Sequence, residues 1–453
     1  MVDRSRLPAI IDDAPFTFPA IHKARLPSGL EVWTTEHGSL PVATMVLLVR
    51  AGSAADPVDR PGLASLTGDM LDEGAGDRDA LGVHDALARI GAQFDTEVGP
   101  DATFLTLTTL SRFRAGGLAL LADLVRRPRF DDHEFERVRQ LRANRLRQLR
   151  DIPSTNADRA FATALYGAHP YGHLPIGTAE ALAQMSAHEV RSLHHRAYRP
   201  SRTVLIVAGT ASPAQVIDEV AGAFGDWRDP EDAAAVAPHV ETPPRPTDRL
   251  WLIDRPGAAQ SELRIGHLGV TRRTPDYHAL LVANLVLGGQ FVSRLNMNLR
   301  ERRGYTYGAR SWFEFRLGPG PFQISASVQT EVTADAMREA MAEMADLRGA
   351  RPIALAELDT ARATLTRGYP RNFETSDQIA RSVAQLALYE LPDDYFATFV
   401  PRVAGLTLAE VQHAATRHLR PEDLLAVVVG DAARVAATLE SLGLGLPRLT
   451  AVA

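Results

Sequence analysis

The chain has 453 residues, a formal net charge of −6 and no cysteine. The length suits two domains of about 200 residues each, and a hydrophobic content of 45% is enough for two cores. The missing cysteine excludes disulfides, cysteine metal sites and a cysteine nucleophile, and without charge blocks there is no reason to expect nucleic acid or a membrane surface as a partner.

The first residues, MVDRSRLPAIIDDAPF, contain no apolar core of signal-peptide length. We therefore expect a cytoplasmic protein, or a periplasmic one if a signal peptide has been removed. No window approaches the roughly 18 consecutive apolar residues of a membrane-spanning helix, so no such helix is expected.

Strand and helix patterns alternate along the first half without regular βαβ spacing. Apolar runs of strand length come first and amphipathic helical patterns follow. Strands are expected at 30–36, 43–52 and 103–110, and helices at 134–150 and 187–198. Residues 228–248 then contain five prolines and no helical or strand period, which is typical of a linker between domains.

The second half repeats this mixture. A helix is expected at 275–287, with Thr274 as its cap and Pro275 in its first position, and another at 333–347. In the expected strand 322–328, apolar and polar residues alternate. One buried face and one wet face are typical of an antiparallel sheet.

The two halves are copies of one unit. The sequence 189-EVRSLHHRAYRPSRTVLIVAG-209 matches 410-EVQHAATRHLRPEDLLAVVVG-430 at a constant offset of 221 residues. Both copies contain an amphipathic helix that ends before Arg-Pro and an apolar run typical of a buried strand. A weaker match joins 134–140 to 357–363 at an offset of 223 residues, in the same order.

These observations predict an α+β fold with two homologous units. The N-terminal unit would cover residues 1–227, the linker residues 228–248 and the C-terminal unit residues 249–453. Each unit would be a largely antiparallel sheet with helices packed on one face.

A search for catalytic motifs finds no complete site. His169 and His173 have the spacing of a helical metal site, but the segment HPYGH predicts a turn with solvent-facing imidazoles. The acidic stretch 69-DMLDEG-74 is interpreted as a solvated helix end, and 318-GPGPF-322 as a tight turn without the residues of a phosphate loop. The Gly-x-Ser-x-Gly motif of hydrolases is also missing.

The stretch 299-LRERRGYTYGARSWF-313 combines a cationic helix end with a tyrosine-rich strand. Arg300 is expected in the last turn of a helix that Gly304 ends. Tyr305 and Tyr307 are two residues apart and are expected to share a face of the strand. Because Arg suits a helix C-terminus and aromatic residues usually pack within sheets, the local pattern alone favours a structural role.

Several segments together resemble the pitrilysin/insulinase family of zinc metallopeptidases. The stretch 287–311 is similar to the family's pattern Leu-Gly-Gly, Ser-Arg-Leu, then Leu-Arg-Glu-x-x-Gly-x-x-Tyr. The matching residues are Leu287, Gly288, Gly289, Ser293, Arg294, Leu295, Leu299, Arg300, Glu301, Gly304 and Tyr307. Other matching stretches are 27-PSGLEVW-33, 51-AGSAADP-57, 62-GLASLTGDML-71 and 169-HPYGHLPIGT-178. The resemblance covers nearly the whole chain and implies two units that form half of a clamshell.

The chain departs from the family at the metal site. Active members carry His-x-x-Glu-His after Gly-Leu-Ala, where the two His bind zinc and the Glu activates a water. These positions hold Ser65, Gly68 and Asp69. The family's third ligand, a Glu on a later helix, would fall near Asn144 and Arg145. The resemblance therefore implies no metal in this chain and zinc only in a partner subunit.

In active members of the family, the pair that matches Arg300 and Tyr307 closes over the bound peptide. We therefore expect a non-catalytic subunit of a heterodimeric metallopeptidase. It would supply both residues in trans to a zinc-bearing paralogous subunit, which hydrolyses a peptide or unfolded polypeptide. One alternative is a catalytically inactive peptide-binding or scaffold protein, alone or as a homodimer. Another, an independent hydrolase with a displaced metal site, is disfavoured because no second histidine pair has helical spacing.

Overall fold

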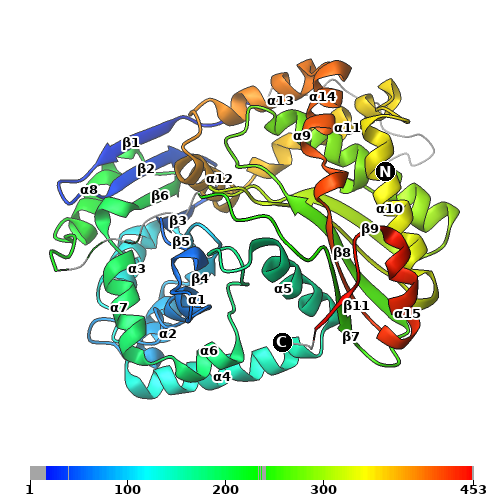
Figure 1. Ribbon diagram of the computed structural model, residues 1–453. Coiled ribbons are helices and arrows are strands. Elements are labelled where there is room, and N and C mark those ends of the chain that lie inside the picture. The colour runs from blue at the N-terminus through cyan, green and yellow to red at the C-terminus, as the bar shows by residue number, and fades with distance from the viewer. Residues whose placement is uncertain (1–16, 39, 233, 235, 237–240, 451–453) are drawn as a thin grey trace, which may run out of the picture.

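The computed structural model describes residues 17–38, 40–232, 234, 236 and 241–450, which form two six-stranded sheets (Figure 1). The strands of the first sheet are β1 (Ile21–Arg25), β2 (Glu31–Glu36), β3 (Val42–Val49), β4 (Gln93–Val98), β5 (Thr103–Leu110) and β6 (Thr203–Gly209). Those of the second are β7 (Leu250–Asp254), β8 (Gln260–Leu268), β9 (Thr306–Phe313), β10 (Pro321–Gln329), β11 (Leu425–Gly430) and β12 (Arg448–Thr450).

Helices accompany both sheets. Those of the first half are α1 (Leu63–Asp69), α2 (Ala80–Arg89), α3 (Arg114–Arg126), α4 (Asp132–Arg150), α5 (Pro153–Tyr166), α6 (Ala179–Gln184), α7 (Ala187–Ala197) and α8 (Pro213–Phe224). Those of the second half are α9 (Tyr277–Asn284), α10 (Thr333–Arg348), α11 (Leu355–Arg367), α12 (Ser376–Tyr389), α13 (Tyr395–Gly405), α14 (Leu408–His418) and α15 (Ala432–Leu439). Two π-helical segments, η4 (Leu285–Gly289) and η5 (Asn296–Arg302), follow α9.

Five strands of each sheet share one topology, whereas the edge strands β1 and β12 differ, because β1 pairs antiparallel with β2 and β12 pairs parallel with β7. Their strand orders are β1-β2-β6-β3-β5-β4 and β12-β7-β11-β8-β10-β9. In each sheet one central pair is parallel, β2 with β6 and β7 with β11, and the strands that follow pair antiparallel. The repeated helices α7 and α14 both begin with a capping box, formed by Ser186 with Glu189 and by Thr407 with Glu410. The predicted α+β fold of two like units is confirmed.

Each sheet is also covered by a helix from the other half, which the sequence patterns did not predict. Helix α12 of the second half packs against β3 and β6 of the first sheet, and α5 of the first half packs against β8 and β11 of the second (Figure 1). The central strands are therefore buried on both faces. This explains why β3, β6 and β11 are almost continuously apolar rather than alternating.

Close contacts fix the exchanged helix α5 on the second sheet. Gly266 leaves room for the ring of Phe161, because a Cβ there would lie 2.9 Å from Phe161 Cζ. The buried Arg264 on β8 donates from Nε to Asp158 Oδ1 at 2.5 Å and from Nη2 to the Ser154 carbonyl at 3.1 Å. Phe161 and Arg264 are both buried, and their contacts link the first half of the chain to the second sheet.

Two element boundaries need comment. The helix expected at 275–287 begins at Tyr277, because the Thr274 hydroxyl accepts a hydrogen bond from the Asp276 amide within a preceding turn. Its last part is the π-helical segment η4. Between Phe224 and Leu250 the described residues contain no helix or strand, and we keep 1–227, 228–248 and 249–453 as the proposed domain limits. In the described part of the chain, no helix is both long and apolar enough to cross a membrane.

Candidate functional sites

The first candidate site lies between α1 and α4, where the family's metal site would be. Ser65 and Asp69 are one turn apart on α1 and face the same arginine of α4. Arg142 Nη2 donates to Ser65 Oγ at 2.9 Å and forms an ion pair with Asp69, while its Nη1 donates to the Ile176 carbonyl at 3.2 Å. Only 6% of the Arg142 side chain is exposed. A buried guanidinium thus bridges the two positions at which the family resemblance led us to expect metal-binding His in active members.

The other two predicted positions do not join this cluster. Gly68 packs against β4, and a Cβ at this position would lie 2.9 Å from Thr96 Cγ2. Asn144 accepts hydrogen bonds from its helical neighbours Gln140 and Arg147. Asn144 therefore contacts neither Ser65 nor Asp69 in the recorded hydrogen bonds of the described chain.

Sequence reasoning missed Arg142, although α4 carries a signal for it. Phe135, Val138 and Leu146 form the buried stripe of this helix, and Arg142 falls on the same stripe at helical spacing. A charged residue at a core position requires a partner of opposite charge, because an unpaired buried charge is costly. Here the partner is Asp69.

A cavity of about 470 Å³ lies beside this cluster. Its walls come from α1 and the turn after it, from β4 and from α4. They include Asp69, Asp72, Phe94, Thr96, Arg142 and Arg145. Burial, together with the neighbouring Glu73 carboxylate, raises the pKa of Asp72.

Zinc does not fit the donors present at this site. Ser65 is a weak ligand, Gly68 has none to offer, and the Arg142 guanidinium already pairs with the one carboxylate, Asp69. Among the described residues, no group of three or more His, Cys, Asp or Glu side chains is arranged to hold a metal ion.

The prediction of a solvated acidic stretch at 69–74 holds for Asp69, whose side chain is 47% exposed, but not for Asp72 and Glu73. Asp69 pairs with Arg142, Glu73 pairs with Arg137, and Asp72 is largely buried. The arginines of α4 therefore neutralise this end of α1, because the two helices pack side by side.

The turn predicted for HPYGH is present, but the prediction of a solvent-facing imidazole is wrong for His173, whose side chain is 20% exposed. Burial lowers the pKa of His173, whose Nε2 lies 3.8 Å from Asp56 Oδ2. Tyr171, between the two histidines, bonds to Asp101, and the Asp101 carboxylate accepts the Leu317 amide of the other half at 2.8 Å. The turn predicted at 318–322 packs here, since the Gly318 amide donates to the Tyr171 hydroxyl at 3.2 Å. The HPYGH segment therefore joins the two halves of the chain.

The second candidate site is the stretch with Arg300 and Tyr307. Arg300 lies on η5, and the Gly304 amide donates to its carbonyl at 3.1 Å where the helix ends. Gly304 has φ = +65°, which favours glycine at this C-terminus. The Arg300 guanidinium lies 4.5 Å from the centroid of the Phe291 ring and donates to Glu301 Oε1 at 2.9 Å.

Tyr307 is turned outward by an irregularity in β9. The register with β10 shifts between Thr306 and Ala309, so that Tyr307 and Gly308 both lie opposite Ser327. The Thr306 hydroxyl bonds to the Gly308 and Ser327 backbone and holds this bulge. Tyr307 is 92% exposed as a result.

The expectation that Tyr305 and Tyr307 share a face is wrong. Tyr305 precedes β9 and packs against the second core, while Tyr307 is almost fully exposed. The rule of alternate faces holds for a regular strand, and the bulge interrupts it at this position.

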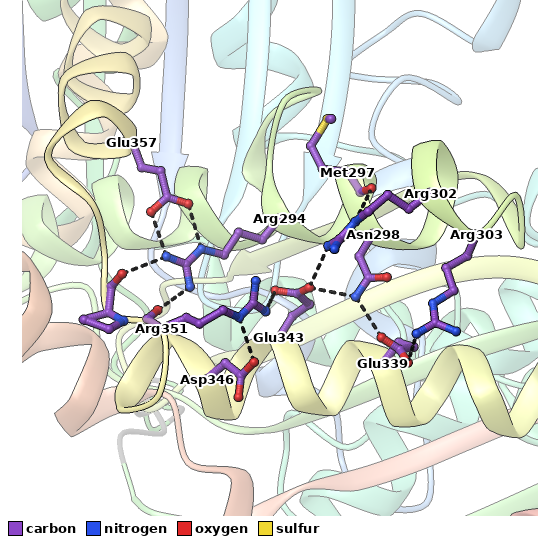
Figure 2. A network of polar contacts seen from close by, with 11 residues as sticks. Arg294, Met297, Asn298, Arg302, Arg303, Glu339, Glu343, Asp346, Arg351 and Glu357 are labelled. Atoms are coloured by element: carbon purple, nitrogen blue, oxygen red, sulfur yellow. Dashed lines mark hydrogen bonds and ion pairs between the residues drawn. The ribbon is translucent and has the colours of Figure 1, made fainter.

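A polar network fixes η5 to α10 (Figure 2). Glu343, whose side chain is 1% exposed, accepts from Asn298 Nδ2 at 2.7 Å and from Arg351 Nη2 at 2.5 Å. Arg303 pairs with Glu339 at 2.6 Å. On the opposite side, Arg294 makes a two-pronged ion pair with Glu357 of α11. The network anchors the segment while Arg300 and Tyr307 take no part in it.

The two candidate sites lie at corresponding edges of the two sheets. Helix α1 packs against β4, the last strand of the first sheet, and η5 packs against β9, the last strand of the second. In the described chain, no recorded hydrogen bond or ion pair joins Arg300 or Tyr307 to the cluster around Arg142. The two candidate sites of one chain therefore lie on different sheets.

Comparisons with known proteins agree with this architecture. Residues 32–175 match the family described as Insulinase (Peptidase family M16), and residues 184–365 match Peptidase M16 inactive domain. The chain belongs to peptidase family M16. An uncharacterised zinc protease of Mycobacterium tuberculosis is 27% identical over 91% of this chain and 93% of its own length. A non-peptidase homolog of Helicobacter pylori is 22% identical over 92% of this chain and 94% of its own length.

Solved M16 structures share the fold. The M16 inactive domain from Pseudomonas fluorescens has a TM-score of 0.85 at 26% identity, covering 91% of this chain and 98% of that one. The periplasmic protease PqqL from Escherichia coli has a TM-score of 0.78 at 15% identity, covering 95% of this chain but 48% of the other. This M16 chain therefore corresponds to about half of the longer protein.

Proposed function

We propose that this chain is a non-catalytic M16 subunit that supplies Arg300 and Tyr307 in trans to the active site of a zinc-bearing paralogous subunit. The substrate is a peptide or an unfolded polypeptide. The observation that carries the proposal is the contrast between the two sites. The expected metal positions carry Ser65 and Asp69, which bind the buried side chain of Arg142, whereas Tyr307 is 92% exposed.

The chemistry of the pair suits this role. Attack on a peptide carbonyl creates an oxyanion, and a phenol O–H is a neutral donor for that charge. A guanidinium is able to hold a neighbouring carbonyl oxygen. Arg300 is only lightly engaged, by an exposed ion pair to the adjacent Glu301, and such pairs contribute little stability. Both groups are therefore available to a bound peptide.

Two features support a second subunit. The chain matches about half of the PqqL chain, so that a chamber of four units requires another chain. The Arg142 cluster and the Arg300 site also lie apart, at the edges of different sheets. The identity of the partner subunit and its bound zinc are parts of the proposal. The compartment is also part of it, with the cytoplasm as the first expectation and the periplasm as the second.

The proposal is tested by mixing the purified chain with a zinc-bearing M16 relative from the same organism. Cleavage of a quenched fluorescent peptide should be faster in the mixture than with the relative alone. Arg300→Ala and Tyr307→Phe should each lower turnover by about tenfold or more, because removing one oxyanion donor typically costs about 10²–10³. Tyr305→Phe is the matched control, since Tyr305 packs against the core.

Three outcomes would overturn the proposal. They are equal cleavage with and without the chain, unchanged turnover in the Arg300 and Tyr307 variants, or stoichiometric zinc in the isolated chain. The second candidate is a peptide-binding protein without a role in cleavage. The cavity of about 470 Å³ beside the edge strand β4 favours it, and peptide binding without any effect on the relative would support it.

A further inference from the structure

Four large hydrophobic side chains are exposed within one short stretch around Arg300. Phe291 is 64% exposed, Val292 57%, Met297 42% and Tyr307 92%. Single exposed hydrophobic residues are normal on protein surfaces, whereas a cluster of them marks an interaction site.

The buried side chain of Asn296 brings these residues together. Its Nδ2 donates to the Gln290 carbonyl at 3.2 Å, next to Phe291. Its Oδ1 accepts the Ala309 amide at 2.9 Å, two residues after Tyr307. Asn296 itself begins η5, the segment that carries Met297 and Arg300. Three pieces of chain are thus held side by side by one amide.

The mode of binding at this surface is restricted by β9. Its outward backbone groups are already bonded, the Ala309 amide to Asn296 and the Ser311 carbonyl to Asn284 Nδ2 at 3.0 Å. A peptide therefore has no free ladder positions at Ala309 and Ser311 through which to join the sheet as a further strand. Recognition here has to use side chains.

The charges around the surface are mostly positive. Arg300 lies over the Phe291 ring, and the exposed Arg310 has no recorded ion pair or side-chain hydrogen bond in the described chain. Glu301 is the acidic residue nearest to Arg300 in sequence, and Glu314, which pairs with Arg316, is the one nearest to Arg310. An occupant with carboxylates near its apolar side chain complements this surface.

We propose that Phe291, Val292, Met297 and Tyr307 form a docking surface for a large apolar side chain of an extended peptide that carries acidic residues nearby. This inference rests on the proposed function, in which Arg300 and Tyr307 grip a peptide, and it adds the class of side chain that the site selects. Arg310 lies opposite Ser325, two residues along β10 from Ser327, and so stands about 7 Å along the strand from Tyr307. The acidic residues of the peptide should lie at a similar distance from its apolar side chain.

The test measures binding of fluorescein-labelled nonapeptides to the isolated full chain by anisotropy. The parent peptide is Gly-Ser-Glu-Gly-Leu-Gly-Glu-Ser-Gly, with a Glu two positions on each side of the Leu. The comparison peptides replace the Leu by Ser, both Glu by Lys, or all three. The parent should bind best, with about tenfold loss for the Ser peptide because a buried Leu side chain contributes that much or more.

Variants assign the effect to residues. The double variant Phe291→Ala, Met297→Ala should remove most of the preference for Leu over Ser. Arg310→Gln should reduce the preference for Glu over Lys and leave the Leu preference intact. Val58→Ala is the matched control, because Val58 is 82% exposed in the other half of the chain. Circular dichroism and the unfolding midpoint establish that each variant is folded.

The outcomes separate this inference from the proposed function. Equal binding of Leu and Ser peptides, or an unchanged preference in the double variant, overturns the inference. The double variant could bind the peptides normally but no longer associate with a zinc-bearing relative in sedimentation experiments. This result also overturns the inference, and the surface is then a subunit interface. The proposed function survives in all of these cases if Tyr307→Phe still lowers cleavage in the mixture.

Discussion

At the residue scale, Arg142 joins α1 to α4 where a metal ion would join them in active relatives. Its guanidinium makes three contacts, with Ser65, Asp69 and the Ile176 carbonyl.

Replacing Arg142 by Ala should lower the free energy of unfolding by about 2 kcal/mol, because it removes a buried side chain together with its hydrogen bonds to Ser65, Asp69 and the Ile176 carbonyl. Arg145→Ala, an exposed change one turn later on α4, should alter it by less than about 0.5 kcal/mol. Urea unfolding followed by circular dichroism measures both. Equal effects of the two substitutions would show that Arg142 does not hold the helices together.

His267 provides a test of pH dependence. Its Nε2 accepts the Arg420 amide at 3.0 Å, so the proton sits on Nδ1, which donates to the Leu268 carbonyl at 2.9 Å. Burial lowers the pKa of His267 to about 4. Since the unfolded chain takes up a proton near pH 6.5, the stabilisation is complete above that pH and is lost as the pH falls towards 4.

Between pH 7 and pH 5 the wild type should therefore lose on the order of 2 kcal/mol more than His267→Gln, which has no titrating group there. His194 and His278 also have lowered pKa values and shift stability in the same direction. The difference between wild type and variant isolates His267. Parallel pH profiles of the two proteins would contradict the prediction.

At the element scale, the exchanged helix α12 depends on its C-terminal end. Arg50, just after β3, donates from Nη2 to the Ala387 carbonyl at 2.7 Å and from Nη1 to the Leu388 carbonyl at 3.4 Å. A cation at this position satisfies free carbonyl groups and interacts favourably with the helix dipole.

Arg50→Ala should weaken the docking of α12 on the first sheet by about 1–2 kcal/mol. Amide hydrogen exchange in α12 should become roughly tenfold faster, while exchange in α14 stays unchanged. Arg50→Lys keeps the charge but not the fork of two donors, and should have a smaller effect. Equal acceleration in both helices would indicate a global loss of stability instead.

At the scale of the whole molecule, the exchange of α5 and α12 makes the two halves interdependent. Each sheet would expose one apolar face without the helix from the other half. Figure 1 shows α5 beside β11 and α12 beside the first sheet.

Separate fragments 1–232 and 233–453 should therefore fail to fold alone, and should co-purify as a folded pair when they are co-expressed. The measurements are near-UV circular dichroism and size-exclusion chromatography. A monomeric fragment with native-like near-UV signals would show that the exchanged helix is dispensable for that half. Cutting the chain elsewhere, inside α5 for example, should abolish rescue.

The sequence by itself determined the elements and their duplication. Alternation in 322–328 and the apolar runs at 203–209 and 425–430 are local properties, so they predicted β10, β6 and β11 correctly. The matching stretches around Ser65 and Arg300 also indicated the family and the departure from its metal motif.

Only the tertiary structure decided which surfaces meet. An apolar run demands burial but does not specify the helix that provides it, and so the exchange of α5 and α12 was not predicted. The partner of Arg142 and the bulge that exposes Tyr307 likewise depend on contacts between segments far apart in sequence or on neighbouring strands. The hydrophobic periodicity of a segment shows which of its faces must be buried. Which other segment covers that face is decided by the packing of the whole chain.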